Sequence, residues 1–131
     1  MKILGVGVDI VENSRIKKLL KNSRFIKRIF TTSEILQTKK INNKVSYYSK
    51  RYAAKEAFSK SIGTGFRDGL NFNDVSIINN NLGKPSFIIN NKIKQLIKKK
   101  FNTSRFNFFL SISDEKKYSI AYVVLQKNGK K

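Results

Sequence analysis

The first residues alternate between the two sides of an extended backbone, a period of two that is typical of a β-strand over residues 2–11. One side of this expected strand is apolar and consists of Leu4, Val6, Val8 and Ile10. The other side carries Ile3, Gly5, Gly7 and Asp9. Glycine weakens a strand interior unless another backbone or a ligand approaches closely. The pattern therefore predicts a bare face that an element or a ligand contacts, with Asp9 at its end as a turn cap or a functional group.

Residues 13–30 repeat their apolar positions with helical spacing, in one piece or two, and Asn13 or Ser14 is the candidate N-cap. The expected apolar stripe consists of Ile16, Leu19, Leu20, Phe25, Ile26, Ile29 and Phe30. The other positions hold a cluster of cations: Arg15, Lys17, Lys18, Lys21, Arg24, Lys27 and Arg28. This basic cluster is either a solvated face or a docking face for an acidic partner.

A capping box is predicted at Thr31-Thr32-Ser33-Glu34, with Thr31 as the N-cap and Glu34 three residues later. A short helix to about residue 39 should follow. A structural role is the better interpretation of this segment.

Residues 45–62 form the clearest expected helix. Its narrow apolar stripe consists of Ala54, Ala57, Phe58, Ser61 and Ile62. Glu56 and Lys60 are four residues apart on a different face, and such a pair stabilises a helix by about 0.2–0.5 kcal/mol. Ion pairing within the helix is therefore sufficient to explain both residues. Gly63 suits the left-handed residue that ends a helix, and the Gly63–Gly69 loop is more simply a turn than a phosphate cradle.

The second half of the chain predicts more strands and one basic helix. Strands are expected at 74–79 and 86–90, with Gly83 in the turn between them, and a helix at 91–100. Strands at 106–113 and 118–126 should form a hairpin that turns at residues 114–117. Neither a repeat nor a linker interrupts the sequence, so we expect one domain over residues 1–131, with 127–131 as a frayed basic tail.

The chain is strongly basic: its 131 residues include 28 Lys and Arg against 8 Asp and Glu, a net charge of +20. Such a charge favours polyanionic partners, although lysine-rich and asparagine-rich composition alone can produce it. The amino terminus reaches Asp9 and Glu12 before a signal-peptide core is complete, and no apolar run approaches the ~18 residues of a membrane span. A soluble cytoplasmic protein without a membrane partner is expected.

The absence of Cys and His narrows the chemistry. It excludes disulfides, zinc or haem sites built from thiolate or imidazole, cysteine nucleophiles and histidine-based triads. Magnesium remains open, because it binds one or two carboxylates and takes its other ligands from water and phosphate. Asp9 and Glu56 could hold such an ion with Lys60 one turn further along the helix, but spacing alone does not show that they meet.

Three segments carry a resemblance to a known family. Gly5-Val6-Gly7-Val8-Asp9-Ile10-Val11-Glu12 and the helix segment from Arg51 to Lys60 resemble the two main motifs of the holo-acyl-carrier-protein synthase group of 4′-phosphopantetheinyl transferases. Phe30-Thr31-Thr32-Ser33-Glu34 resembles the segment between them, and Gly63-Thr64-Gly65, Gly83-Lys84-Pro85 and Ser111-Ile112-Ser113 follow in the family's order. The resemblance extends over nearly the whole chain.

The resemblance implies an α+β fold, a mainly antiparallel sheet packed against a long central helix and shorter helices. It also implies a reaction, in which a serine of apo acyl carrier protein attacks the β-phosphate of coenzyme A. Phosphopantetheine moves to the serine and adenosine 3′,5′-bisphosphate leaves, a step in fatty acid biosynthesis. Similar enzymes are homotrimers with active sites between subunits, so a neighbouring subunit could also approach the Gly5 and Gly7 face.

The family's functional residues map onto this sequence one by one. Asp9 and Glu56 match its Mg²⁺-binding carboxylates, and Lys60 matches a catalytic lysine near the pyrophosphate. A lysine with the ordinary pKa of about 10.4 is a poor base at neutral pH, so an electrostatic role for Lys60, or a metal-bound water as base, is preferred. Two further sets are expected to contact coenzyme A and to dock the acidic carrier protein: Gly83, Lys84, Pro85 and Ser111 for the former, and Arg15, Lys18, Arg24, Phe25 and Arg28 for the latter.

One residue departs from the family: Asp114 stands where a histidine usually follows the Ser-Ile-Ser segment. It either adds a carboxylate near the metal or faces solvent.

Two other functions compete with the transferase. A basic RNA- or ribosome-associated binding protein would fit the charge but not the spacing of Asp9, Glu56 and Lys60. A transferase-like fold without activity is suggested only by Asp114. With the transferase, no nucleic-acid partner is expected.

Overall fold

The computed structural model describes residues 1–67 and 69–129 as an α+β fold, which confirms the expected class. Its elements along the chain are β1 (Lys2–Glu12), α1 (Asn13–Leu19), α2 (Ser23–Ile29), α3 (Thr32–Gln37), η1 (Thr38–Lys40), α4 (Lys44–Ile62), η2 (Phe72–Asp74), β2 (Ser76–Asn79), β3 (Pro85–Ile88), α5 (Asn91–Phe101), β4 (Phe106–Asp114) and β5 (Tyr118–Lys127). Residue 68 of the expected Gly63–Gly69 loop lies outside the described residues, as do residues 130 and 131 of the expected tail.

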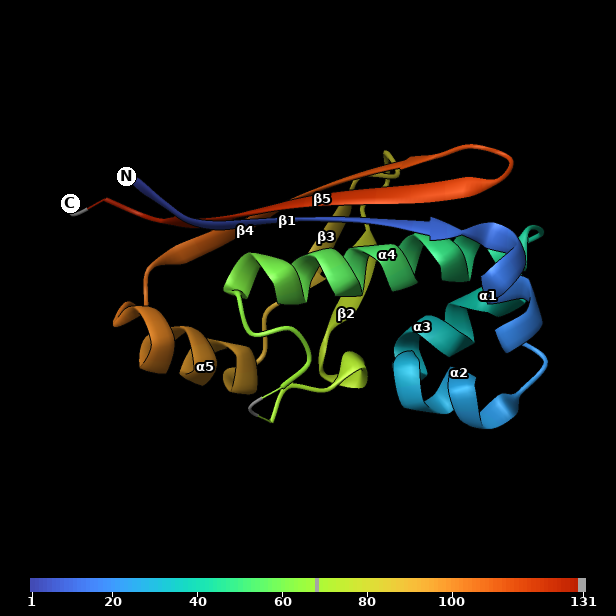
Figure 1. The fold of residues 1–131 in the computed structure, drawn as a ribbon, viewed down its shortest axis with the longest axis horizontal. Helices are drawn as coiled ribbons and strands as arrows, with labels where there is room; N and C mark the ends of the chain where they lie inside the picture. The colour runs from blue at the N-terminus through green and yellow to red at the C-terminus, as the bar shows by residue number, and fades with distance from the viewer. Residues whose placement is uncertain (68, 130–131) are drawn as a thin grey trace.

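A three-stranded antiparallel sheet in the order β1-β5-β4 covers one side of the long helix α4, and β2 and β3 form a separate two-stranded ribbon. Helices α1, α2 and α3 gather at the amino-terminal end of α4, whereas α5 lies near its other end (Figure 1). The predicted hairpin of the last two strands is confirmed. Lys127, expected in the frayed tail, instead pairs with both Lys2 and Phe106 as the last residue of β5.

The bare face of β1 packs directly on α4. A Cβ on Gly5 would lie 1.9 Å from the carbonyl oxygen of Ser61, and a Cβ on Gly7 would lie 1.9 Å from that of Ala57. No side chain fits at such distances, so the glycines allow the strand backbone to touch the helix backbone. The contact brings the end of β1, with Asp9, beside the middle of α4.

The core lies between α4 and the inner face of the sheet, where the predicted stripe of Ala54, Ala57, Phe58 and Ile62 is buried. An aromatic cluster extends this core toward α2. Phe25 is only 6% exposed there, with its ring centroid 6.3 Å from that of Phe30 and 6.2 Å from that of Tyr52. Phe25 therefore belongs to the apolar stripe of its helix, and the expectation that its side chain docks a partner is not supported.

The expected helix over 13–30 consists of two pieces, and the candidate caps of the first were wrong. Glu12 is the N-cap residue of α1, without a side-chain cap. The Asn13 amide instead donates to the carbonyl oxygens of Glu115 and Lys116, and its oxygen accepts from Ser119. Asn13 therefore fixes the β4–β5 turn rather than a helix end.

The capping box of Thr31 and Glu34 and the left-handed Gly63 at the end of α4 are confirmed.

The outer face of the three-stranded sheet is apolar and exposed. Outward-facing residues stand side by side across the strands, with Val8 opposite Tyr122 and Ile10 opposite Ile120. Val6, Val8, Ile10, Phe109, Ile120 and Tyr122 are each 38–59% exposed. We call these six residues the outer apolar face. In residues 1–67 and 69–129, no helix is long and apolar enough to cross a membrane.

Candidate active site

Asp9, Glu56 and Lys60 converge where β1 leaves the surface of α4. The Lys60 ammonium lies 3.1 Å from Asp9 Oδ1 and donates to the carbonyl oxygen of Val8 at 3.2 Å. The expected ion pair within the helix is wrong, since the ion pair that Lys60 forms among the described residues is with Asp9 rather than Glu56. Lys60 thus links α4 to β1, although it lies 51 residues from Asp9 in the sequence.

The surroundings of these acids favour their neutral forms. Burial raises the pKa of Glu56, the neighbouring Asp9 carboxylate raises it further, and Lys60, Tyr52 and Arg15 oppose the shift. Burial likewise raises the pKa of Asp9, although the hydrogen bond and charge of Lys60 pull it down. Two carboxylates in a partly buried site repel each other unless a cation lies between them.

The donor set suits a hard cation. Carboxylate oxygens are the ligands that Mg²⁺ prefers, and two of them leave room for water and phosphate oxygens. No group of three or more His, Cys, Asp and Glu side chains with metal-binding geometry exists within the part of the chain that the structure describes. A magnesium ion bound here would therefore be held by Asp9 and Glu56 alone among the acids.

A separate open groove of about 820 Å³ lies at the other side of α4. Its walls come from α3 through Ser33 and Gln37, from α4 through Tyr47, Lys50 and Arg51, and from β2 through Ile77, Ile78 and Asn79. The lining also includes Gly83 from the β2–β3 turn, Pro85 at the start of β3, and Ile112 and Asp114 from β4. The groove combines apolar side chains with two cations, Lys50 and Arg51, and one acid, Asp114, and its excess of positive charge would suit a partly apolar anion.

The residues expected around coenzyme A divide between two places. Gly83 and Pro85 line the groove, and the exposed Lys84 lies between them in the turn. Ser111 does not share this location, because it points to the outer face of the sheet, opposite Tyr122. Its neighbours in β4, Ile112 and Asp114, face the groove instead. The alternation of a strand separates Ser111 from the groove by one residue.

Asp114 is one of the residues that line the groove. Its Oδ2 accepts a hydrogen bond of 3.1 Å from the Ser46 hydroxyl, and the side chain is exposed. In the sheet it stands opposite Ser119, whereas Asp9 stands opposite Ala121 on the far side of β5. Within one chain, Asp114 belongs to the groove that Lys50 and Arg51 line, not to the Asp9 and Glu56 pair.

The basic cluster of α1 and α2 lies on the surface. Arg15, Lys18, Arg24 and Arg28 are all exposed, in contrast to Phe25. The cations expected to dock an acidic partner are therefore accessible in the folded chain.

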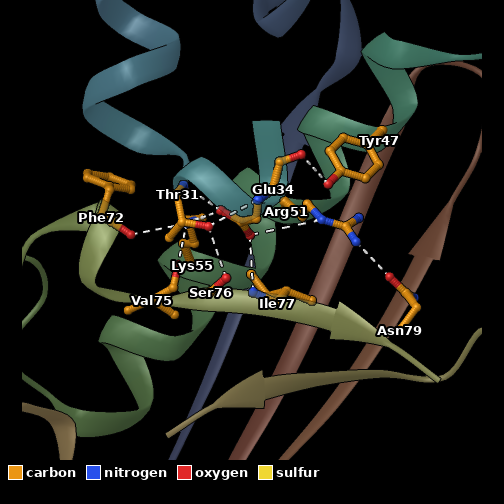
Figure 2. Close-up of polar contacts among 10 residues, drawn as sticks. All are labelled: Thr31, Glu34, Tyr47, Arg51, Lys55, Phe72, Val75, Ser76, Ile77 and Asn79. Carbon is orange, nitrogen blue, oxygen red and sulfur yellow. Dashed lines mark hydrogen bonds and ion pairs between the residues drawn. The ribbon is translucent and has the colours of Figure 1, made fainter. Parts of the chain in front are cut away.

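Sequence reasoning missed a buried polar network between α3, α4 and β2 (Figure 2). Lys55 Nζ lies 2.7 Å from Glu34 Oε1, with both side chains fully buried, and it also donates to the carbonyl oxygens of Phe72 and Val75. Arg51 donates to the Asn79 side chain at 2.6 Å and stacks on the Tyr47 ring at 3.8 Å. The only signal in the sequence was the capping box of Glu34, and a capping box does not indicate that its acid also pairs with a lysine from another helix.

Comparisons with known proteins agree with the fold. The sequence profile of the 4′-phosphopantetheinyl transferase superfamily matches residues 5–123. The chain therefore belongs to the 4′-phosphopantetheinyl transferase superfamily.

Among its relatives in that superfamily is the holo-[acyl-carrier-protein] synthase of Pelagibacter ubique, 71% identical over 97% of this chain and 99% of the relative. The synthase of Wigglesworthia glossinidia brevipalpis is 43% identical over 98% of this chain and 95% of its own.

Solved structures of the same kind share the fold. The holo-[acyl-carrier-protein] synthase from Neisseria meningitidis superposes with a TM-score of 0.86 at 37% identity, covering 95% of this chain and 99% of the other. The enzyme from Bacillus anthracis, solved in complex with CoA (3′,5′-ADP), gives a TM-score of 0.80 at 33% identity, with 98% and 100% covered.

Proposed function

We propose that the protein is a Mg²⁺-dependent holo-[acyl-carrier-protein] synthase, which transfers 4′-phosphopantetheine from coenzyme A to a serine of apo acyl carrier protein. The observation that carries this proposal is the convergence of Asp9 and Lys60, with Glu56 beside them, in a chain of this superfamily. Structures of similar proteins with coenzyme A or its 3′,5′-ADP part support the choice of donor.

Asp9 and Glu56 would hold the magnesium ion, which supplies positive charge to the pyrophosphate when bound. Burial is the main reason that the pKa values of both acids are raised, and a bound cation would lower them by favouring the ionised carboxylates. The residues of the chain then have separate tasks: the two acids hold the cation, and Lys60 brings a further positive charge to the same place.

Lys60 is well placed for an electrostatic role. In the transfer, the serine hydroxyl gives up its proton to water and its oxygen forms a bond to the β-phosphorus. The bond from that phosphorus to the bridging oxygen breaks, and adenosine 3′,5′-bisphosphate leaves with that oxygen. Negative charge grows on the leaving group, and an ammonium fixed beside it stabilises that charge. Because Lys60 is anchored to Asp9 and to the Val8 carbonyl oxygen, its ammonium is positioned before substrate arrives.

The groove is the proposed site for the nucleotide part of coenzyme A. Lys50 and Arg51 offer positive charge, and Ile77, Ile78 and Pro85 offer apolar surface for a base. Gly83 and Lys84 belong to the same corner. The groove and the Asp9 site lie on different sides of α4, so one coenzyme A molecule would join the groove of one subunit to the acids of another.

A homotrimer would supply that arrangement. The outer apolar face exposes Val6, Val8 and Ile10 of β1 beside Ile120 and Tyr122 of β5. Contiguous exposed apolar surface of this kind marks an interface with another protein. A second copy is the proposed occupant, and Ser111, which stands opposite Tyr122 of that face, would then contact a neighbouring subunit.

The carrier protein would dock on the exposed cations Arg15, Lys18, Arg24 and Arg28. An acidic carrier is attracted by a +20 chain, and this attraction weakens as salt is added. The product would serve fatty acid biosynthesis in the cytoplasm.

The test mixes the protein with coenzyme A, magnesium and an apo carrier protein, and measures the mass of the carrier. A gain equal to one phosphopantetheine group supports the proposal. An unmodified carrier, together with tight and salt-sensitive RNA binding by the protein, would favour the alternative of a nucleic-acid-binding module.

A further inference from the structure

Glu34 is a buried acid of α3 that interacts with three of the elements that form the walls of the groove, α3, α4 and β2. Its side chain begins in α3, which contributes Ser33 and Gln37 to the lining. One carboxylate oxygen accepts from the backbone nitrogen of Thr31 at 2.9 Å and the other from the backbone nitrogen of Ile77 in β2 at 3.1 Å. The residue is 1% exposed and is not among the residues that line the groove, so it supports the walls without contacting a ligand.

The same carboxylate also holds the third wall, α4. Lys55 lies 2.7 Å from Oε1, and the Nε atom of Arg51 lies 4.0 Å from Oε2. Arg51 continues outward to Asn79 and Tyr47, both of which line the groove (Figure 2). Glu34 therefore connects α3, α4 and β2 through interactions that all end on one side chain.

The negative charge of Glu34 stabilises the two buried cations of α4, Arg51 and Lys55. Burial lowers the pKa of Arg51 and of Lys55, and in each case the Glu34 carboxylate works against that shift. Arg51 Nε has no hydrogen-bond partner within the described part of the chain, so Glu34 is the anion that faces it. Without this carboxylate, the guanidinium would keep only Asn79 and the Tyr47 ring as partners and would move toward solvent.

We propose that Glu34 is a positioning residue for the coenzyme A groove: it fixes Arg51 and the β2 wall against α4, so that it governs the affinity for coenzyme A and not the transfer step. This inference rests on the proposed function, because it takes coenzyme A as the ligand of the groove. The separation between the groove and Asp9 is what predicts an effect on KM without one on kcat.

The test compares Glu34→Gln with the wild-type protein in transfer kinetics and in coenzyme A binding by calorimetry. Glutamine keeps the shape but loses the charge. Its NH₂ group only donates, so one of the two backbone N–H groups loses its acceptor. The KM for coenzyme A and its Kd should rise about fivefold or more, while kcat at saturating coenzyme A stays within about twofold.

A stability-matched control separates positioning from loss of folding. Ile97→Ala opens a cavity in α5, where Ile97 is fully buried and is not part of the groove lining. It should lower the melting temperature without changing KM. The double variant with Glu34→Gln and Lys55→Met removes both charges of the Glu34–Lys55 ion pair and should be more stable than Glu34→Gln alone. Its coenzyme A affinity should stay weak because Arg51 still lacks its carboxylate.

A Glu34→Gln protein with unchanged KM and Kd for coenzyme A would overturn the inference. If that variant does not fold, wild-type coenzyme A affinity in the double variant would overturn it instead. In both cases, transfer by the wild-type protein would still support the proposed function. A fall in kcat alone would also overturn it. A wild-type protein that neither binds coenzyme A nor modifies the carrier would overturn the proposed function and this inference with it.

Discussion

Gly7 of β1 lies in backbone contact with Ala57 of α4: a Cβ on Gly7 would come 1.9 Å from the Ala57 carbonyl oxygen. Two residues further along the strand is Asp9, and the residue before Ala57 is Glu56. The close approach of strand and helix is therefore the feature that brings the two acids of the candidate site together. A side chain at position 7 would separate them.

Gly7→Ala should accordingly damage both the fold and the site. Backbone atoms cannot yield as a flexible side chain does, so the strand must move away from α4, at a cost of about 1–3 kcal/mol or more. Thermal unfolding should show a lower melting temperature, and transfer should fall with it. Gly129→Ala is the matched control, because its Cβ would meet its nearest neighbour at an ordinary 3.5 Å. A Gly7→Ala protein with wild-type stability would contradict the packing described.

The raised pKa of Glu56 predicts that this acid destabilises the metal-free fold at neutral pH. A carboxyl group whose pKa is higher in the folded state binds its proton more tightly there, so stability falls as pH rises from its ordinary pKa of about 4.3 through the raised value. Glu56→Gln should therefore melt at a higher temperature than the wild type at pH 7 in chelator, with the difference vanishing toward pH 4.3. Glu12→Gln, an exposed acid of β1, should show no such gain. A less stable Glu56→Gln at neutral pH would refute the assignment.

The role of Lys60 is decided by its conservative variant. Lys60→Arg keeps a positive charge near Asp9 but cannot act as a base, so under the electrostatic role it should retain substantial transfer, whereas Lys60→Met should lose about 100-fold or more. Steady-state kinetics over a range of pH measures both. Equal and complete loss in the two variants would instead identify the Lys60 amine as the proton acceptor.

The outer apolar face predicts self-association. Tyr122→Lys places a charge among Val8, Ile10 and Ile120 and should convert the assembly into single chains of 15.1 kDa, as measured by light scattering after size exclusion. Leu82→Lys is the control, since Leu82 is 93% exposed in the β2–β3 turn and outside that face. A wild-type protein that runs as a single chain would rule out a trimer.

Asp114 should weaken coenzyme A binding rather than support catalysis. Its carboxylate shares the groove with Lys50 and Arg51 and would repel a phosphate. Asp114→Asn and Asp114→His should therefore leave transfer intact or lower the KM for coenzyme A. A large loss of activity in both variants would show that the carboxylate is required, as a metal-related role would demand.

Local patterns predicted the elements of the fold well, because the information lies within a few residues. The capping box of Thr31 and Glu34, the left-handed end of α4 at Gly63 and the final hairpin depend on neighbours in sequence. The glycines of β1 predicted that another element approaches their face closely. That element is α4, whose contact residue Ala57 is 50 residues beyond Gly7, and the sequence of the strand does not identify it.

Tertiary contacts decided the rest. Lys60 had a suitable partner four residues away in Glu56, yet the structure pairs it with Asp9. Nothing in the sequence around Lys55 predicts its burial, yet it is fully buried, because Glu34 and two backbone carbonyl groups satisfy its ammonium. The family resemblance placed Phe25 among the residues that dock the carrier protein, whereas its position in the apolar stripe favoured the core, where it lies. Burial of a polar group depends on partners that no local spacing reveals.

The central claim, that Asp9 and Glu56 act together in phosphopantetheine transfer, is tested most directly by the mass of an apo carrier protein after incubation with coenzyme A and magnesium. With wild-type protein the carrier should gain one phosphopantetheine group. With Asp9→Asn or Glu56→Gln, each confirmed to be folded, it should stay unmodified under the same conditions. Full modification of the carrier by both folded variants would contradict the account.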